Sequence, residues 1–168
     1  GFNLNGIHYV RNKADVVAIM RDLPEVKEVA IVGGGYIGLE AAAVLKKLGK
    51  IVTVIEASDR VLARVAGEPL SRFYEREHKA QGVDIRLSQN SREACGKDGR
   101  VHGLRMSDGS EILAQMIIVG IGVEPSVKAL LEAGASGDLG VDVDEYCQTT
   151  VSDIYAIGDC ATHRNAYA

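Results

Sequence analysis

The chain has 168 residues, a formal net charge of −4 at pH 7, 46% hydrophobic and 25% charged residues, and no tryptophan. This length suits one domain with a sizeable core, and the acidic balance argues against a nucleic-acid partner. No apolar run approaches the roughly 20 residues that span a bilayer, so we expect no membrane association. Cys95, Cys147 and Cys160 form no C-x-x-C pair, which argues against a metal site and favours a reducing, cytoplasmic location.

Helical and strand-like patterns alternate along the first half of the chain. The expected elements are a helix at 14–23, a strand at 28–33, a helix at 36–48, a strand at 51–56, a helix at 70–80 and a strand at 83–87. The strands are short β-branched runs, which is typical of strands buried on both faces. The first helix is expected to turn one apolar face to the core, formed by Val16, Val17, Ile19, Met20 and Leu23.

The pattern changes after residue 97. Turn signals at Asp98-Gly99 and Asp108-Gly109 separate strand-like runs, which predicts an antiparallel meander over 97–120. The later expected elements are a buried strand at 116–120, a short helix at 127–135, a strand at 139–149 and a final strand at 153–159. Together these elements predict the α/β class, as a Rossmann-like doubly wound parallel sheet with an inserted antiparallel β-meander.

A glycine motif lies between the strand at 28–33 and the following helix. Its spacing, Gly33-x-Gly35-x-x-Gly38, is the dinucleotide-binding fingerprint: the first glycine permits a tight turn, the second lets a pyrophosphate reach the backbone, and the third lets the helix pack on the strand. The helix N-terminus supplies N–H groups to the anion. The expected pyrophosphate-binding segment is Gly33, Gly34, Gly35, Tyr36, Ile37 and Gly38.

An acidic residue ends the next predicted strand. Glu56 lies 18 residues beyond Gly38, where a carboxylate accepts hydrogen bonds from ribose hydroxyls and repels a 2′-phosphate. With Ala57 beside it, Glu56 predicts NAD(H) rather than NADP(H). Arg60 and Arg64 follow closely, and an arginine there can pair with a phosphate, so Arg64 also belongs to the expected site.

Four segments in series resemble a known family. They are "VAIVGGGYIGLEAAAVLKKLG", "VTVIEASDRVLARVAGEPLSRFY", "IIVGIGVEPSV" and "TTVSDIYAIGDCA". They resemble the flavoprotein reductases with two dinucleotide-binding domains, the pyridine nucleotide-disulfide oxidoreductase superfamily. Within it the chain is most similar to the FAD-dependent ferredoxin, putidaredoxin and rubredoxin reductases.

The resemblance implies a division of the chain and a set of further site residues. Residues 1–150 would form the NAD-binding domain and 151–168 the start of the second FAD-domain segment, with the rest of the FAD domain and an interface domain outside these residues. Near the nicotinamide the resemblance implies Tyr36, Glu40, Gly120, Ile121 and Gly122, and at the flavin Asp159.

The resemblance also implies a reaction. Hydride would pass from NADH to FAD, and electrons onward to an iron–sulfur ferredoxin or a rubredoxin-type acceptor. The cofactors carry this chemistry, so we expect neither a catalytic acid–base pair nor a metal site in the chain. Two alternatives stay open: an NADH oxidase, nitrite reductase or CoA-disulfide reductase of the same fold, or an isolated nucleotide-binding module without turnover.

Overall fold

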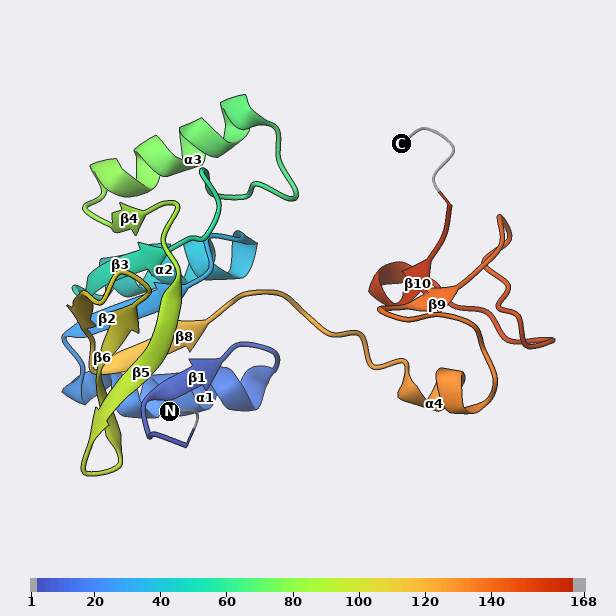
Figure 1. Ribbon diagram of the computed structural model, residues 1–168, viewed down its shortest axis with the longest axis horizontal. Helices are drawn as coiled ribbons and strands as arrows, with labels where there is room; N and C mark the ends of the chain where they lie inside the picture. Colours follow the sequence, from blue (N-terminus) through green and yellow to red (C-terminus); the bar gives the residue numbers. More distant parts are fainter. Residues whose placement is uncertain (1–2, 165–168) are drawn as a thin grey trace. The chain divides into compact units, whose positions relative to one another are not determined.

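The computed structural model describes residues 3–164 and divides into two compact units (Figure 1). The first unit runs through Ile121 and the second begins at Gly122. The described part of the chain contains no helix long and apolar enough to cross a membrane.

A five-stranded parallel sheet forms the centre of the first unit. Its strands, in spatial order, are β1 (Ile7–Tyr9), β8 (Met116–Val119), β2 (Glu28–Val32), β3 (Ile51–Ile55) and β4 (Asp84–Arg86). Val32 pairs with Ile55 on one side and with Val119 on the other. The carboxyl ends of the three central strands therefore lie side by side, which is the edge where open α/β sheets bind ligands.

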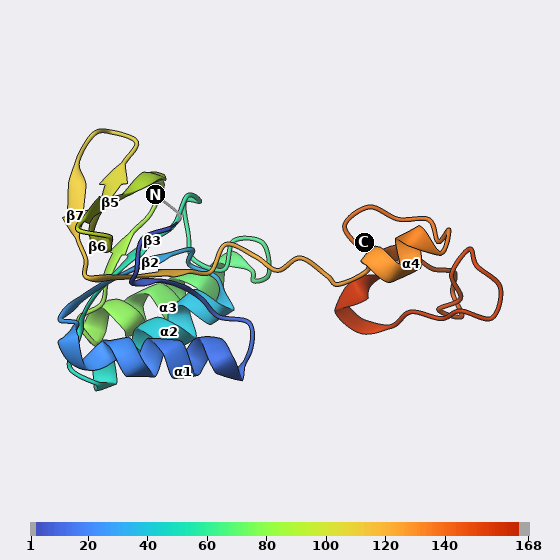
Figure 2. The same ribbon diagram turned by 90° about the horizontal axis from the view of Figure 1, so that it is seen from below.

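The two faces of this sheet have different covers. The helices α1 (Lys13–Asp22), α2 (Tyr36–Lys47) and α3 (Glu68–Ala80) lie on one face, and α1 leads into a short 3₁₀ helix at Leu23–Glu25 (Figure 2). An antiparallel sheet of β5 (Ser91–Lys97), β6 (Arg100–Met106) and β7 (Glu111–Leu113) covers the other face. The predicted α/β class with a parallel sheet and an inserted meander is confirmed, although the meander begins earlier than expected, at Ser91.

Alternation along β2 shows how the sheet serves both layers. Val29 and Ile31 pack with the helices, whereas Ala30 packs with the antiparallel sheet, and all three are buried. Successive side chains of a strand point to opposite faces, so a strand covered on both sides must be apolar throughout. Because β2 is packed on both faces, its carboxyl end holds the start of the glycine loop in place.

The expected core face of α1 is partly wrong. Ile19 is buried in the core, as is Leu23 just after the helix, but Val16, Val17 and Met20 are 46%, 57% and 54% exposed. The helix packs along one edge of the sheet, against β1, and its buried stripe is narrower than the sequence pattern indicated. The short edge strand β1, which pairs in parallel with β8, was not predicted.

The second unit contains little regular structure. Its elements are α4 (Lys128–Glu132), β9 (Val141–Asp142), a 3₁₀ helix at Gly158–Cys160 and β10 (Ala161–Thr162). The strand expected at 139–149 shrinks to the two residues of β9. The strand expected at 153–159 is wrong, because Asp153 and Gly158 adopt left-handed φ angles of 62° and 77° that interrupt an extended run.

Candidate nucleotide-binding site

The glycine loop joins the carboxyl end of β2 to the first turn of α2. Gly33 has a φ of 109°, and its N–H donates to the carbonyl of Ile55 at 2.8 Å. A side chain at Gly33 would collide with the carbonyl of Gly120, and one at Gly38 would collide with the carbonyl of Gly33. Glycine is therefore required at both positions because another part of the protein backbone lies where a side chain would stand.

Gly35 differs from its neighbours because nothing lies within 4 Å of the place where a Cβ would stand. It is the N-cap of α2 and provides no side-chain cap. The N–H groups of a first helical turn have no partner within the helix, and the helix dipole favours an anion at this end. The open space and uncapped amides fit a pyrophosphate approaching the backbone.

Glu56 follows β3 on the opposite wall of the site. One carboxylate oxygen accepts from the Gly34 N–H at 2.7 Å and the other from the Ser58 N–H at 2.7 Å. Burial acts to raise the pKa of the Glu56 carboxyl, but these hydrogen bonds and the charge of Arg64 outweigh it, and the pKa lies below its usual value. Glu56 is therefore negatively charged at neutral pH.

A cavity of about 400 Å³ lies between these two walls. Nine of the residues expected from the sequence line it: Gly33, Gly34, Gly35, Tyr36, Glu56, Ala57, Arg64, Gly120 and Ile121. The side chain of Tyr36 is 48% exposed. The segments after β2, β3 and β8 meet here because these strands end at the same edge of the sheet.

Other expected site residues lie elsewhere. Gly38 is buried beneath the loop, and Ile37 and Glu40 are outside the cavity lining, Glu40 on an exposed face of α2. Gly122 and Asp159 belong to the second unit, where Asp159 is exposed in the 3₁₀ helix.

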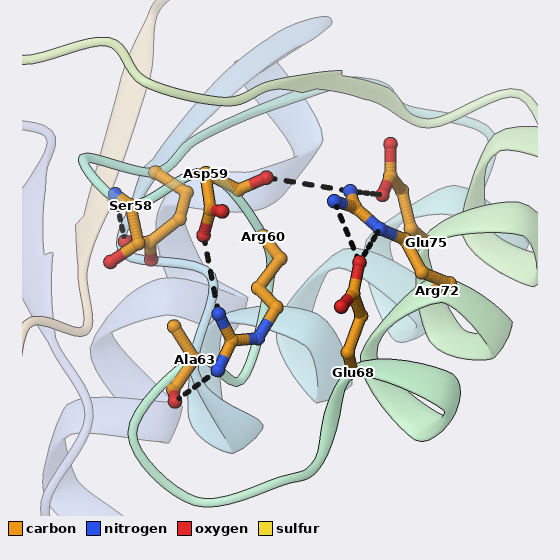
Figure 3. A network of polar contacts seen from close by, with 8 residues as sticks. Ser58, Asp59, Arg60, Ala63, Glu68, Arg72 and Glu75 are labelled. Carbon is orange, nitrogen blue, oxygen red and sulfur yellow. Dashed lines mark hydrogen bonds and ion pairs between the residues drawn. The ribbon is translucent and has the colours of Figure 1, made fainter.

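The two arginines of the β3–α3 loop have different surroundings. Arg60 donates to the Asp59 carboxylate at 3.3 Å and to the Ala63 carbonyl at 3.1 Å, so it holds the loop itself together (Figure 3). Arg64 is exposed, lines the cavity, and reaches the carbonyl of Ile121 at 3.4 Å. Of the two, only Arg64 lines the cavity and can meet a bound anion there.

The β3–α3 loop is also tied to α3. Arg72 donates to the Asp59 carbonyl at 3.4 Å and pairs with Glu68 and Glu75 on its own helix (Figure 3). These contacts join the β3–α3 loop to the first two turns of α3.

Sequence reasoning missed part of the cavity. Ser58, Leu62, Ala63, Val65, Gln89, Asn90 and Ser91 also line it. Gln89 and Asn90 follow β4, the next parallel strand after β3. Because ligands in open α/β sheets lie outside the carboxyl ends of the strands, the end of the strand expected at 83–87 was the available signal for these residues.

The pyridine nucleotide-disulphide oxidoreductase family matches residues 1–168. The 5,5'-dehydrodivanillate O-demethylase ferredoxin reductase subunit of Sphingobium sp. is 57% identical over 175 residues, covering 100% of this chain and 41% of that protein. A ferredoxin–NAD(P)(+) reductase of Sphingomonas sp. is 52% identical over 168 residues, with the same two coverages of 100% and 41%.

Solved structures agree with the sequence relatives. A ferredoxin reductase from Rhodopseudomonas palustris superposes with a TM-score of 0.93 at 32% identity, covering 98% of this chain and 41% of that one. The chain thus spans about two fifths of the length of the relatives it matches. The match over the whole sequence shows that the chain belongs to the pyridine nucleotide-disulphide oxidoreductase family.

Proposed function

We propose that this chain is the NADH-binding part of a flavoprotein reductase that passes hydride from NADH to FAD and electrons on to an iron–sulfur protein. Two relatives that cover the whole chain are named as ferredoxin reductases, which supports the choice of acceptor. FAD would supply the redox chemistry, because a flavin accepts two electrons as hydride and can release them one at a time. The residues of this chain bind and orient the nucleotide.

The proposal rests on one observation: the glycine loop and Glu56 line the same cavity. On one wall, Gly35 leaves open space before the uncapped amides of α2. On the other, Glu56 presents a carboxylate fixed by two backbone N–H groups. A pyrophosphate fits the first wall and a ribose with free hydroxyls fits the second.

The charge of Glu56 supports NADH over NADPH. Two like charges about 4 Å apart repel by about 4 kcal/mol at the effective dielectric constant of a protein surface. Arg64 on the same cavity opposes this repulsion, but it is exposed and screened by solvent. Glu56 is half-buried and held in place, so its effect on a 2′-phosphate is the larger one.

The second unit contributes the proposed flavin contact. Gly158 has a φ of 77° with no atom within 4 Å of a Cβ position, and Asp159 beside it is exposed, so both are open to a ligand. We assign 1–150 to the NAD-binding domain and 151–168 to the FAD-domain segment, whose last four residues lie outside the described residues. Gly122 and Glu40 are assigned to the nicotinamide end, and a cytoplasmic location is part of the proposal.

The test is a titration of this chain with NADH and NADPH, followed by mixing of the full-length flavoprotein with NADH and an iron–sulfur acceptor. We expect NADH to bind at least about tenfold more tightly, equal to about 1.4 kcal/mol, and to reduce the bound flavin. Glu77→Gln, which neutralises an exposed carboxylate on α3, is the control and should leave both affinities unchanged. Tighter binding of NADPH would refute the nucleotide assignment, and no reduction of flavin would refute the reaction.

A further inference from the structure

Gly34 is the one glycine of the loop that the dinucleotide fingerprint leaves unexplained, since the fingerprint needs only positions 33, 35 and 38. Both backbone groups of Gly34 are bound to the segment after β3. Its N–H donates to Glu56 at 2.7 Å, and its carbonyl accepts from the Leu62 N–H at 2.9 Å. We call this set of contacts the Gly34–Glu56 clasp.

We propose that Glu56 is a positioning residue, whose carboxylate holds the glycine loop and the β3–α3 loop in one fixed arrangement before any nucleotide binds. Its two oxygens divide the task, one accepting from Gly34 and the other from Ser58. Each oxygen keeps a further lone pair, so the same carboxylate can still accept from a ribose hydroxyl. The effect of the clasp on binding rests on the proposed function; the clasp itself does not.

The steric surroundings of Gly34 point to the same role independently. A Cβ at this position would stand 3.1 Å from the Glu56 carboxylate, 3.2 Å from the Glu56 Cβ and 3.1 Å from a methyl group of Val61. Such distances are shorter than ordinary van der Waals contact, so a side chain would push Glu56 away. Gly34 is thus glycine because Glu56 must come close to the loop.

The clasp links pyrophosphate binding to ribose selection, which the fingerprint assigns to separate residues. The loop that receives the pyrophosphate and the residue that selects the ribose share one hydrogen bond, across 22 positions of sequence. A change at Glu56 made to admit NADPH would also leave two backbone N–H groups without their acceptor, and unpaired amides in a half-buried site are costly. Affinity for both nucleotides would fall.

The first experiment measures amide hydrogen exchange at Gly34 and Ser58 in the nucleotide-free protein. We expect both amides to exchange about tenfold faster or more in Glu56→Ala, the scale of losing a hydrogen bond to a charged acceptor. Glu56→Gln has one amide oxygen and should protect only one of the two. Glu77→Gln is the matched control and should match the unchanged protein. Exchange unaltered in Glu56→Ala would overturn the clasp, whatever the protein binds.

The second experiment is a double-mutant cycle between Gly34→Ala and Glu56→Ala, read by NADH affinity. Gly34→Ala keeps every ribose-contacting group and places its methyl against Glu56 and Val61, yet we expect it to weaken NADH binding. Its effect should shrink in the Glu56→Ala background, because both changes act on one contact. Additive effects would overturn the positioning role, as would unchanged affinity in Gly34→Ala alone. NADH binding absent from the unchanged protein would refute the proposed function, while the exchange result would still decide the clasp.

Discussion

Gly35→Ala separates the fold from nucleotide binding more cleanly than any other single change in the loop. The residue has φ −79° and ψ −176°, which alanine adopts without strain, and no atom lies within 4 Å of the added methyl. Alanine is a poorer N-cap than glycine by roughly 0.5 kcal/mol. Replacing glycine by alanine also reduces the conformational entropy of the unfolded chain, which stabilises the folded protein by about 0.4–1 kcal/mol. The free energy of unfolding should therefore change by less than about 0.5 kcal/mol.

Binding should respond differently because the methyl group of Gly35→Ala occupies the space assigned to the pyrophosphate. Moving that anion away from the amides of α2 loses one or more hydrogen bonds to a charged group, each worth about 1.5–3 kcal/mol. Affinity for NADH should fall by roughly 10- to 100-fold.

The assay for Gly35→Ala combines calorimetric titration with NADH and urea unfolding of the same preparation. Affinity equal to that of the unchanged protein would refute the reasoning, since the pyrophosphate would then not approach this backbone. A loss of stability above about 1 kcal/mol would show that the space at Gly35 is not open.

Three further outcomes follow from the same site. Gly38→Ala should lower the free energy of unfolding by about 1–3 kcal/mol in urea titrations, because its methyl meets the fixed carbonyl of Gly33. Arg64→Ala should weaken NADH binding by about 1 kcal/mol and NADPH binding by at least as much, and flatten the salt dependence of both titrations, since its exposed charge attracts each phosphate of the nucleotide. The folded pKa of Glu56 lies below its ordinary 4.5, so the stability it contributes is present above that pH and is lost as pH falls through the folded pKa. Glu56→Gln should remove this part of the acid dependence of unfolding.

The elements around the glycine loop could be predicted because local sequence determines them. The strands β2 and β3 are short runs rich in valine and isoleucine, and α2 has glycine at its start and lysines in its last turn. The edge strand β1 could not be found this way, because its three residues pair with β8, about 110 positions later in the sequence. The prediction of a strand at 153–159 was wrong because Asp153 has a left-handed φ angle, which the pattern of apolar residues does not indicate.

In the candidate site, too, the sequence predicted what depends on local spacing but not what depends on contacts between distant segments. Spacing alone located Gly33, Gly35 and Gly38, and the strand end located Glu56. Spacing could not show that Gly35 faces open space whereas Gly33 and Gly38 face backbone, nor that Gly34 faces Glu56. That difference decides what each glycine does.

A carboxylate with two backbone partners also limits how the nucleotide preference could change. Removing Glu56 takes away the repulsion of a 2′-phosphate, but it also removes the acceptor for Gly34 and Ser58. Adding positive charge at Ala57, which lines the same cavity, leaves those hydrogen bonds intact. A variant that accepts NADPH without losing affinity should therefore keep an acceptor at position 56 and gain its new contact from the β3–α3 loop.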